Sequence, residues 1–147
     1  MLITDALLGE HAVLYSLFSR LEQSLAGSVN MDEIHVAVSL LEASLISHAQ
    51  LENELLFSEL ESRMGPGGPV AVMRAEHDEI DHGLAAAVQA TDSAAGARCL
   101  LDALNVARRH FAKEEQVLFG LARQVLGEAS LSSLGAAWAE RRKVAVG

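Results

Sequence analysis

Two stretches of the chain share one spacing of residue types that can ligate metal ions. HAQLENELLF begins at His48 and HFAKEEQVLF at His110, and each has a Glu four, a Leu eight and a Phe nine positions after its His. Residues four apart on an α-helix lie about 40° apart around the axis and one turn along it. His48 and Glu52 therefore share a helix face, and so do His110 and Glu114.

A second, shorter repeat adds two more histidines. EHAVL contains His11 and EHDEI contains His77, and the separation of these two is close to that of His48 and His110. The first half of the chain therefore corresponds to the second. If the shared faces point inward, a bundle with this duplication brings six side chains to one level, namely His11, His48, His77, His110, Glu52 and Glu114.

Metal coordination is the chemistry that suits such a buried set. An unpaired buried carboxylate is costly, and a bound cation removes that cost. Six protein ligands are too many for one zinc ion, which takes four. Two ions, each with two imidazoles and sharing Glu52 and Glu114, use every group and leave positions open for water or oxygen. Imidazole and carboxylate on facing helices point first to iron, with manganese and zinc behind it.

The rest of the chain supplies helices to hold these residues. Half of it is hydrophobic and only 4% is aromatic, which favours an aliphatic helical bundle over a sheet. Breakers divide it into predicted helices over about residues 4–25, 31–64, 70–90, 95–126 and 131–142. We expect one domain, residues 1–147: an all-α, up-down antiparallel four-helix bundle with a short C-terminal fifth helix.

Composition excludes several other classes of function. The formal net charge of −9 argues against nucleic acid as a partner, and the lone Cys99 excludes an intramolecular disulfide framework. No uninterrupted apolar run approaches the roughly 18 residues of a membrane span, and the acidic N-terminal stretch is unlike a secretory signal. We expect a cytoplasmic protein without a membrane partner, and the sequence leaves a homo-oligomer or a protein partner open.

The six residues resemble the pattern of the hemerythrin-like (HHE cation-binding) family, which has His, HxxxE, His and HxxxE on four successive helices. The matching positions are His11, His48 with Glu52, His77, and His110 with Glu114. The resemblance covers nearly the whole chain and includes AWAERR near the C-terminus. It implies a non-heme centre of two iron ions, oxo- or hydroxo-bridged when oxidised, that meets dioxygen, peroxide or nitric oxide.

The third helix departs from the oxygen-carrying hemerythrins, which resemble this chain but have HxxxH there. Asp81 is four residues after His77, and His82 is five residues after it. On a regular helix His82 lies about 140° from His77, so it would be a ligand only if a π-bulge brought it round. Otherwise His82 is an exposed histidine or a hydrogen-bond partner of a ligand.

Other residues near the pattern have open roles. The carrier proteins place a carboxylate five residues after the fourth-helix His, where this chain has Glu115, but the internal repeat favours Glu114. Glu10 and Glu76 precede ligand histidines, and we expect them to be helix-surface charges rather than hydrogen-bond acceptors for imidazoles. Tyr15 could line the pocket or donate to bound oxygen or peroxide, and is equally well explained as a core or interface residue.

The resemblance implies oxygen or redox sensing, or peroxide detoxification with catalase- or peroxidase-like activity. This chain has one imidazole fewer than the carriers, which favours redox chemistry or sensing over reversible transport. The alternative is iron handling, with delivery or repair of iron centres and a nitric oxide response through the same site. The predicted roles of the protein residues are those of ligands and pocket walls, with no separate catalytic acid or base identified.

Overall fold

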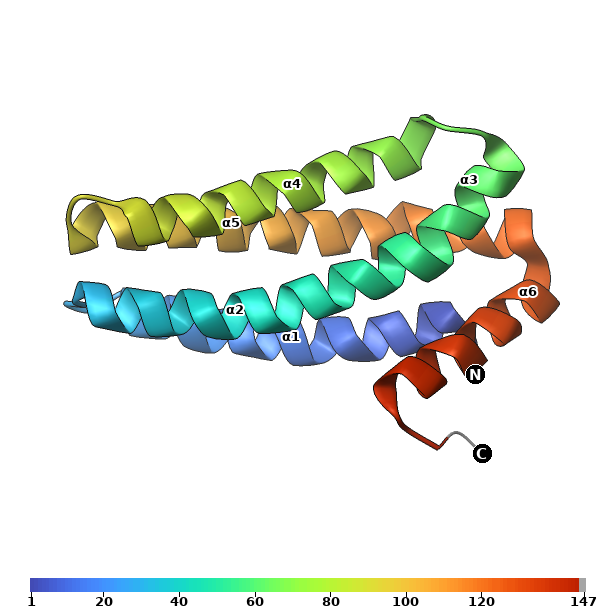
Figure 1. Ribbon diagram of the computed structural model, residues 1–147, viewed down its shortest axis with the longest axis horizontal. Helices are drawn as coiled ribbons and strands as arrows, with labels where there is room; N and C mark the ends of the chain where they lie inside the picture. The colour runs from blue at the N-terminus through green and yellow to red at the C-terminus, as the bar shows by residue number, and fades with distance from the viewer. Residues whose placement is uncertain (146–147) are drawn as a thin grey trace.

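The computed structural model describes residues 1–145 and confirms the predicted all-α bundle of four long antiparallel helices (Figure 1). Its elements are α1 (Ile3–Leu25), α2 (Met31–Leu51), η1 (Glu52–Phe57), α3 (Ser58–Met64), α4 (Gly68–Gln89), α5 (Ser93–Lys113), η2 (Glu114–Leu118) and α6 (Phe119–Arg142). The π-helical segments η1 and η2 join the α-helices on either side of them. The second long helix is therefore α2, η1 and α3 together, and the fourth runs from α5 through η2 into α6.

Local signals in the sequence begin the helices. The Asn30 side chain accepts from the Glu33 backbone N–H at 2.9 Å, and the Glu33 carboxylate accepts from the Asn30 N–H at 2.8 Å. This reciprocal capping was expected from their spacing. Pro69 lies in the first turn of α4. Asp92 caps α5 by accepting from the Ala95 N–H at 2.8 Å, so α5 begins slightly earlier than predicted.

The buried apolar residues form two clusters, one toward each end of the bundle. One cluster includes Phe18, Leu41, Leu84 and Leu104, and the other includes Leu7, Leu60, Val70 and Leu126. The positions of the repeated His and Glu residues along all four long helices fall between these clusters. The apolar packing on both sides therefore fixes the helices that carry the candidate site.

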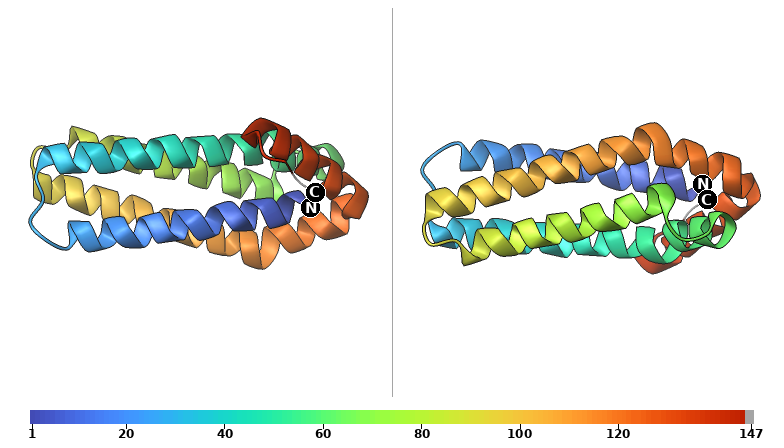
Figure 2. Two further views of the ribbon diagram at one scale, coloured as in Figure 1. Left: turned by 90° about the horizontal axis from the view of Figure 1, so that it is seen from below. Right: turned by 90° about the horizontal axis from the view of Figure 1, so that it is seen from above.

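The C-terminal part of α6 turns back across the end of the bundle beside α1 (Figures 1 and 2). The turn is at Gly127, whose φ of 74° is a left-handed conformation that favours glycine. Gly135 then approaches the N-terminus so closely that a Cβ there would be 3.1 Å from the Ile3 nitrogen. The last helix predicted from the sequence, residues 131–142, is this returning part of α6.

The second long helix is apolar enough in length and composition to pass as a membrane span, with a mean hydropathy of 1.2 over its best window in Met31–Met64. In the structure it is a central helix of the bundle. Its Leu41 and Leu56 are fully buried against the other helices, and it carries the buried, polar His48 and Glu52. The core accounts for only part of its apolar character, because Val36, Leu40 and Ile46 on the same helix are exposed.

Candidate metal centre

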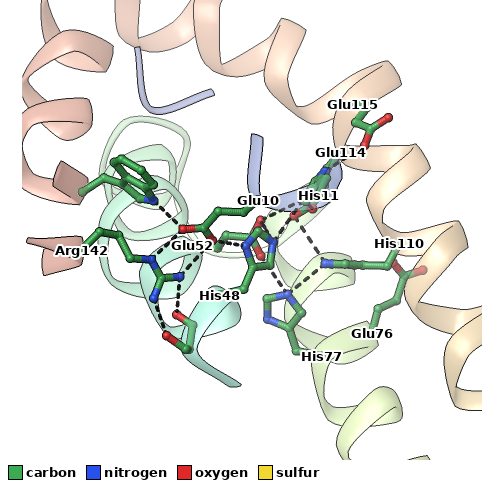
Figure 3. A network of polar contacts seen from close by, with 12 residues as sticks. Glu10, His11, His48, Glu52, Glu76, His77, His110, Glu114, Glu115 and Arg142 are labelled. Atoms are coloured by element: carbon green, nitrogen blue, oxygen red, sulfur yellow. Dashed lines mark hydrogen bonds and ion pairs between the residues drawn. The ribbon is translucent and has the colours of Figure 1, made fainter. Parts of the chain in front are cut away.

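The structure brings the six residues of the repeated pattern together in the middle of the bundle (Figure 3). They form two facing imidazole pairs, one from α1 and α2 and one from α4 and α5. The Nε2 atoms of His11 and His48 are 3.1 Å apart, and those of His77 and His110 are 2.9 Å apart. Every one of the six side chains is buried, with His77 the most exposed at 9%.

The two carboxylates each span both imidazole pairs. Glu52 places Oε1 at 2.9 Å from His48 Nε2 and Oε2 at 3.2 Å from His77 Nε2. Glu114 places Oε2 at 3.3 Å from His11 Nε2 and Oε1 at 3.4 Å from His110 Nε2. Each imidazole pair therefore faces one oxygen from each carboxylate.

The carboxylate oxygens are buried without hydrogen-bond partners. Among residues 1–145, neither oxygen of Glu52 nor either oxygen of Glu114 has a partner in hydrogen-bond geometry. Four such atoms at one place would be strongly destabilising in a protein without a bound cation. Ligand atoms of both carboxylates and either imidazole pair lie within 4.8 Å of one another. The donor set and its orphaned oxygens fit a metal-binding site.

Without a cation, the charges of these groups adjust to one another. Burial alone would lower the pKa of His48, but the Glu52 charge and the hydrogen bond to Glu10 raise it to about 9. Burial would likewise raise the pKa of Glu52, which the His48 charge instead holds well below its usual range. Burial and the Glu52 charge raise the pKa of Glu114 well above its usual range. In the metal-free site the His48 imidazolium thus lies against the Glu52 carboxylate.

Glu10 and Glu76 are hydrogen-bond acceptors for ligand histidines, so the expectation that they are surface charges is wrong. His48 Nδ1 donates to Glu10 at 2.6 Å, and His110 Nδ1 donates to Glu76 at 3.0 Å. Each Glu lies off the inward face of its own helix, and this offset directs it toward the imidazole of the neighbouring helix. Such acceptors leave Nε2 free to ligate and make the imidazole a stronger ligand.

Both of these acceptors are themselves held by cations. Arg142 donates to both oxygens of Glu10, at 2.7 and 2.9 Å, and the Trp138 Nε1–H donates to Glu10 at 2.8 Å. Burial would raise the pKa of Glu10, but these bonds and the one from His48 lower it to about 2. Lys113 forms the corresponding ion pair with Glu76. The repeated Glu-His pairs were a signal for the acceptors, whereas nothing local marked Trp138 or Arg142.

A third acceptor serves His11. Its Nδ1 donates to Glu115 at 2.9 Å, so Glu115 lies beside the site, and Glu114 is the carboxylate within it. Tyr15 is half-buried, edge-on to the His11 ring at 6.4 Å. Burial, followed by the charge of Glu115 and a hydrogen bond to it, raises the pKa of Tyr15 to about 12. Tyr15 thus belongs to the surroundings of His11 and packs against the core.

His82 is exposed on the regular helix α4 and lies outside the cluster, so the structure does not place a fifth imidazole there. The π-helical turns are in the second and fourth long helices instead of the third. Asp81 is also exposed, and it lines a small cavity that His77 and His110 share.

The π-helical turns explain the last residue of the repeat. A residue nine positions after a His points about 180° away from it on a regular helix. One extra residue in a π turn rotates the later side chains around the helix axis. Phe57 therefore lies inside, stacked on His77 with ring centroids 5.6 Å apart, and Phe119 is stacked on His11 at 5.7 Å. Both rings shield the centre from water.

Comparison with known proteins agrees with this geometry. The family model described as the hemerythrin HHE cation-binding domain matches residues 2–122, so the chain belongs to this family. All six cluster residues lie within the match. No curated protein and no solved structure matches the chain. The match ends before AWAERR, so the expectation that the resemblance includes this segment is not borne out, and Trp138 and Arg142 lie beyond it.

Proposed function

We propose that this chain is a non-heme di-iron protein that binds dioxygen or reacts with peroxide at the buried His and Glu cluster. The observation that carries the proposal is that Glu52 and Glu114 each direct one oxygen to each imidazole pair. A single ion could use only part of this set, whereas two ions use all of it. Two imidazoles and two shared carboxylates per ion leave positions for an external ligand.

The side chains around the cluster have definable roles in this function. The carboxylates of Glu10, Glu76 and Glu115 hold three imidazoles so that Nε2 faces the centre. Phe111 stacks on His11 with centroids 3.9 Å apart and restricts water. A bound pair of ferrous ions would supply one electron each to dioxygen or peroxide. We propose oxygen or redox sensing, or turnover of peroxide, rather than reversible transport of oxygen.

Elemental analysis of untagged protein expressed with added iron is the first test. We expect two irons per chain and oxo-bridge absorption in the visible spectrum after oxidation. One zinc, or no metal even after anaerobic reconstitution with ferrous iron, would contradict the proposal. With iron bound, catalytic loss of hydrogen peroxide supports peroxide chemistry, while a spectrum that reverses on removing oxygen supports binding alone.

Iron handling, with delivery or repair of iron centres and a nitric oxide response, is a second candidate. One observation favours it: His77 is the most exposed of the six residues, and its Nδ1 has no hydrogen-bond partner among residues 1–145. An imidazole without an acceptor is a weaker ligand. Rapid transfer of one iron of the reduced pair to a ferrous chelator would support this function, and retention of both irons would oppose it.

A further inference from the structure

The internal repeat allows the two halves of the site to be compared residue by residue, and they differ beside one imidazole. Phe111 follows His110 and covers the first half, where it stacks on His11 at 3.9 Å and meets His48 edge-on at 5.2 Å. The residue that follows His48 is Ala49. The second half therefore has a methyl group where the first half has a phenyl ring.

A second difference affects the same imidazole. Glu115 accepts from His11 Nδ1, and the repeat places Asn53 at the corresponding position for His77. Asn53 does not serve His77, because its side-chain oxygen accepts from Arg74 at 2.8 Å. The Nδ1 atom of His77 is left buried and without a partner among residues 1–145. With Ala49 in place of a phenylalanine and Asn53 in place of a glutamate, His77 has, in the described part of the chain, neither a counterpart of this phenyl ring nor a hydrogen-bond acceptor for Nδ1.

A cavity lies beside His77, where Ala49 takes the place of the phenyl ring of the other half. It has a volume of about 20 Å³ and is lined by Ala49, His77 and His110, together with Leu45, His48, Ile80, Asp81 and Phe111. By this measure one water needs about 10–15 Å³, so the cavity has room for a molecule of one or two heavy atoms. A surface hollow of about 300 Å³ between α2 and α4 shares Ala49, His77 and Asp81 with it. These three side chains therefore lie between the hollow and the cavity or border both.

The opposite side of the site is closed. A groove of about 560 Å³ between α1 and α2 also reaches His48. At that point Glu10 accepts from His48, and Arg142 and Trp138 donate to Glu10. A molecule coming along this groove would have to break a buried, charged network. No corresponding acceptor holds His77 Nδ1 on the α2 and α4 side, among the residues described.

We propose that a small uncharged molecule, of the size of dioxygen or nitric oxide, reaches the site between α2 and α4. It passes Ala49 and Asp81 and binds in the cavity beside His77 and His110. Binding of this molecule to a metal ion rests on the proposed function, but the route and the cavity are properties of the protein itself. The absence of a phenyl ring at position 49 determines which half of the site is open.

Dissolved oxygen tests the route in the metal-free protein, through the paramagnetic relaxation that it causes in methyl proton signals. Ile80 lines the cavity and is 4% exposed, and Met73 is 5% exposed and lines neither the cavity nor the two surface hollows, so the two are matched in burial. We expect oxygen to relax the methyls of Ile80 and Ala49 several-fold more than that of Met73. Equal relaxation, or stronger relaxation at Met73, would overturn the route.

A substitution that fills the cavity tests whether the small molecule binds beside His77 and His110. Ala49→Phe restores the ring of the other half, and Ala43→Phe on the same helix places a ring in the opposite groove. In reduced, iron-loaded protein we expect association of nitric oxide to slow about tenfold or more in A49F and to stay unchanged in A43F. Unchanged association in A49F with full iron content would overturn the proposal.

The two experiments separate the route from the metal chemistry. If A49F does not fold, the smaller Ala49→Val should reduce oxygen relaxation at Ile80 in metal-free protein, and unaltered relaxation would count against the route. If the protein binds no iron, the proposed function fails, while the relaxation experiment still decides whether the cavity admits a diatomic molecule.

Discussion

Arg142, at the end of the C-terminal helix, binds both carboxylate oxygens of Glu10, with Nε at 2.7 Å from Oε1 and Nη2 at 2.9 Å from Oε2. Glu10 in turn accepts from the Nδ1 of His48. A residue outside the family match therefore controls the position of a candidate metal ligand through one intermediate side chain. The C-terminal helix is part of the structure that orients the site.

Replacing Arg142 should alter the metal centre. In Arg142→Ala, Glu10 loses its two-point contact and holds His48 less well, so we expect metal affinity to fall about tenfold. The reduction potential of the iron-loaded protein should shift as well. Arg142→Lys keeps the charge but loses the forked geometry, so it should give an intermediate effect.

Arg141 provides the matched control for this experiment. It is the adjacent arginine, and it pairs with the exposed Glu54 at 2.7 Å, away from Glu10. Arg141→Ala removes the same charge and should change neither affinity nor potential. If both variants change the two quantities equally, the effect would be one of net charge or general stability.

Gly135 should be indispensable for docking of the same helix. A Cβ there would be 3.1 Å from the Ile3 nitrogen and 3.2 Å from the Leu2 carbonyl carbon, which are backbone atoms and cannot move aside easily. We expect Gly135→Ala to lower the free energy of unfolding by about 1–3 kcal/mol, the usual effect of overpacking. Thermal or urea unfolding of metal-free protein measures this change.

Gly120, also in α6, is the control for Gly135. A Cβ at Gly120 would meet no atom within 4 Å. Gly120→Ala should therefore stabilise the protein by up to about 1 kcal/mol, because alanine is the better helix former. Destabilisation by both substitutions to the same extent would show that the approach of Gly135 to the N-terminus is not tight.

The two cluster carboxylates should differ in the metal-free protein although both are needed for metal. Glu52 is ionised beside the His48 imidazolium, so Glu52→Gln removes one of the two carboxylates that hold this charge and should destabilise the protein by up to about 3 kcal/mol. Burial and the Glu52 charge raise the pKa of Glu114, which favours its neutral form, so Glu114→Gln, which is also neutral, should change stability less than Glu52→Gln. Unfolding curves without metal separate the two variants.

Metal content completes this comparison. Both Glu52→Gln and Glu114→Gln replace one of the two carboxylate oxygens with an amide NH2 group, which cannot ligate a metal ion, so both should fail to hold two ions per chain. A Glu114→Gln protein that binds two ions as tightly as the unaltered protein would contradict the assignment of Glu114. Equal destabilisation of the two metal-free variants would contradict the proposed distribution of charge.

The sequence allowed prediction of the bundle and of the six cluster residues because both depend on periodicity within single helices. A face shared by His48 and Glu52 follows from helix geometry alone, and the internal repeat supplies the partner helices. Contacts between side chains of different helices cannot be predicted from the periodicity of a single helix. Glu10 and Glu76 were misassigned because their acceptor role depends on the angle at which neighbouring helices meet.

The π turns and the role of Arg142 could not be predicted from the sequence either. Arithmetic on a regular helix cannot locate a π turn, so a bulge was considered only near His82, and the π turns that bring Phe57 and Phe119 inside were not predicted. Arg142 is 132 residues from Glu10 in the chain, and its role depends on the turn at Gly127. Only the folded structure brings these residues together.

The stability of the metal-free protein should fall as the pH rises from neutral to alkaline values. His48 has a pKa of about 9 in the folded protein, against 6.5 for the unperturbed side chain. Between these values the folded form holds one more proton than the unfolded form, so the free energy of unfolding decreases by about 1.4 kcal/mol per pH unit. The contribution of His48 is fully present below pH 6.5 and lost above pH 9.

Urea unfolding at pH 7 and pH 9 in the presence of a chelator measures this loss, which we expect to be about 2 kcal/mol. The raised pKa of Glu114 acts in the same direction, because a group whose pKa is raised in the folded form loses its stabilising contribution as the pH rises through that pKa. Zinc loading should reverse the sign, since a metal ion binds the deprotonated forms of both groups and its affinity rises with pH. Constant stability from pH 7 to 9 without metal would mean that His48 is not held as an imidazolium by Glu10 and Glu52.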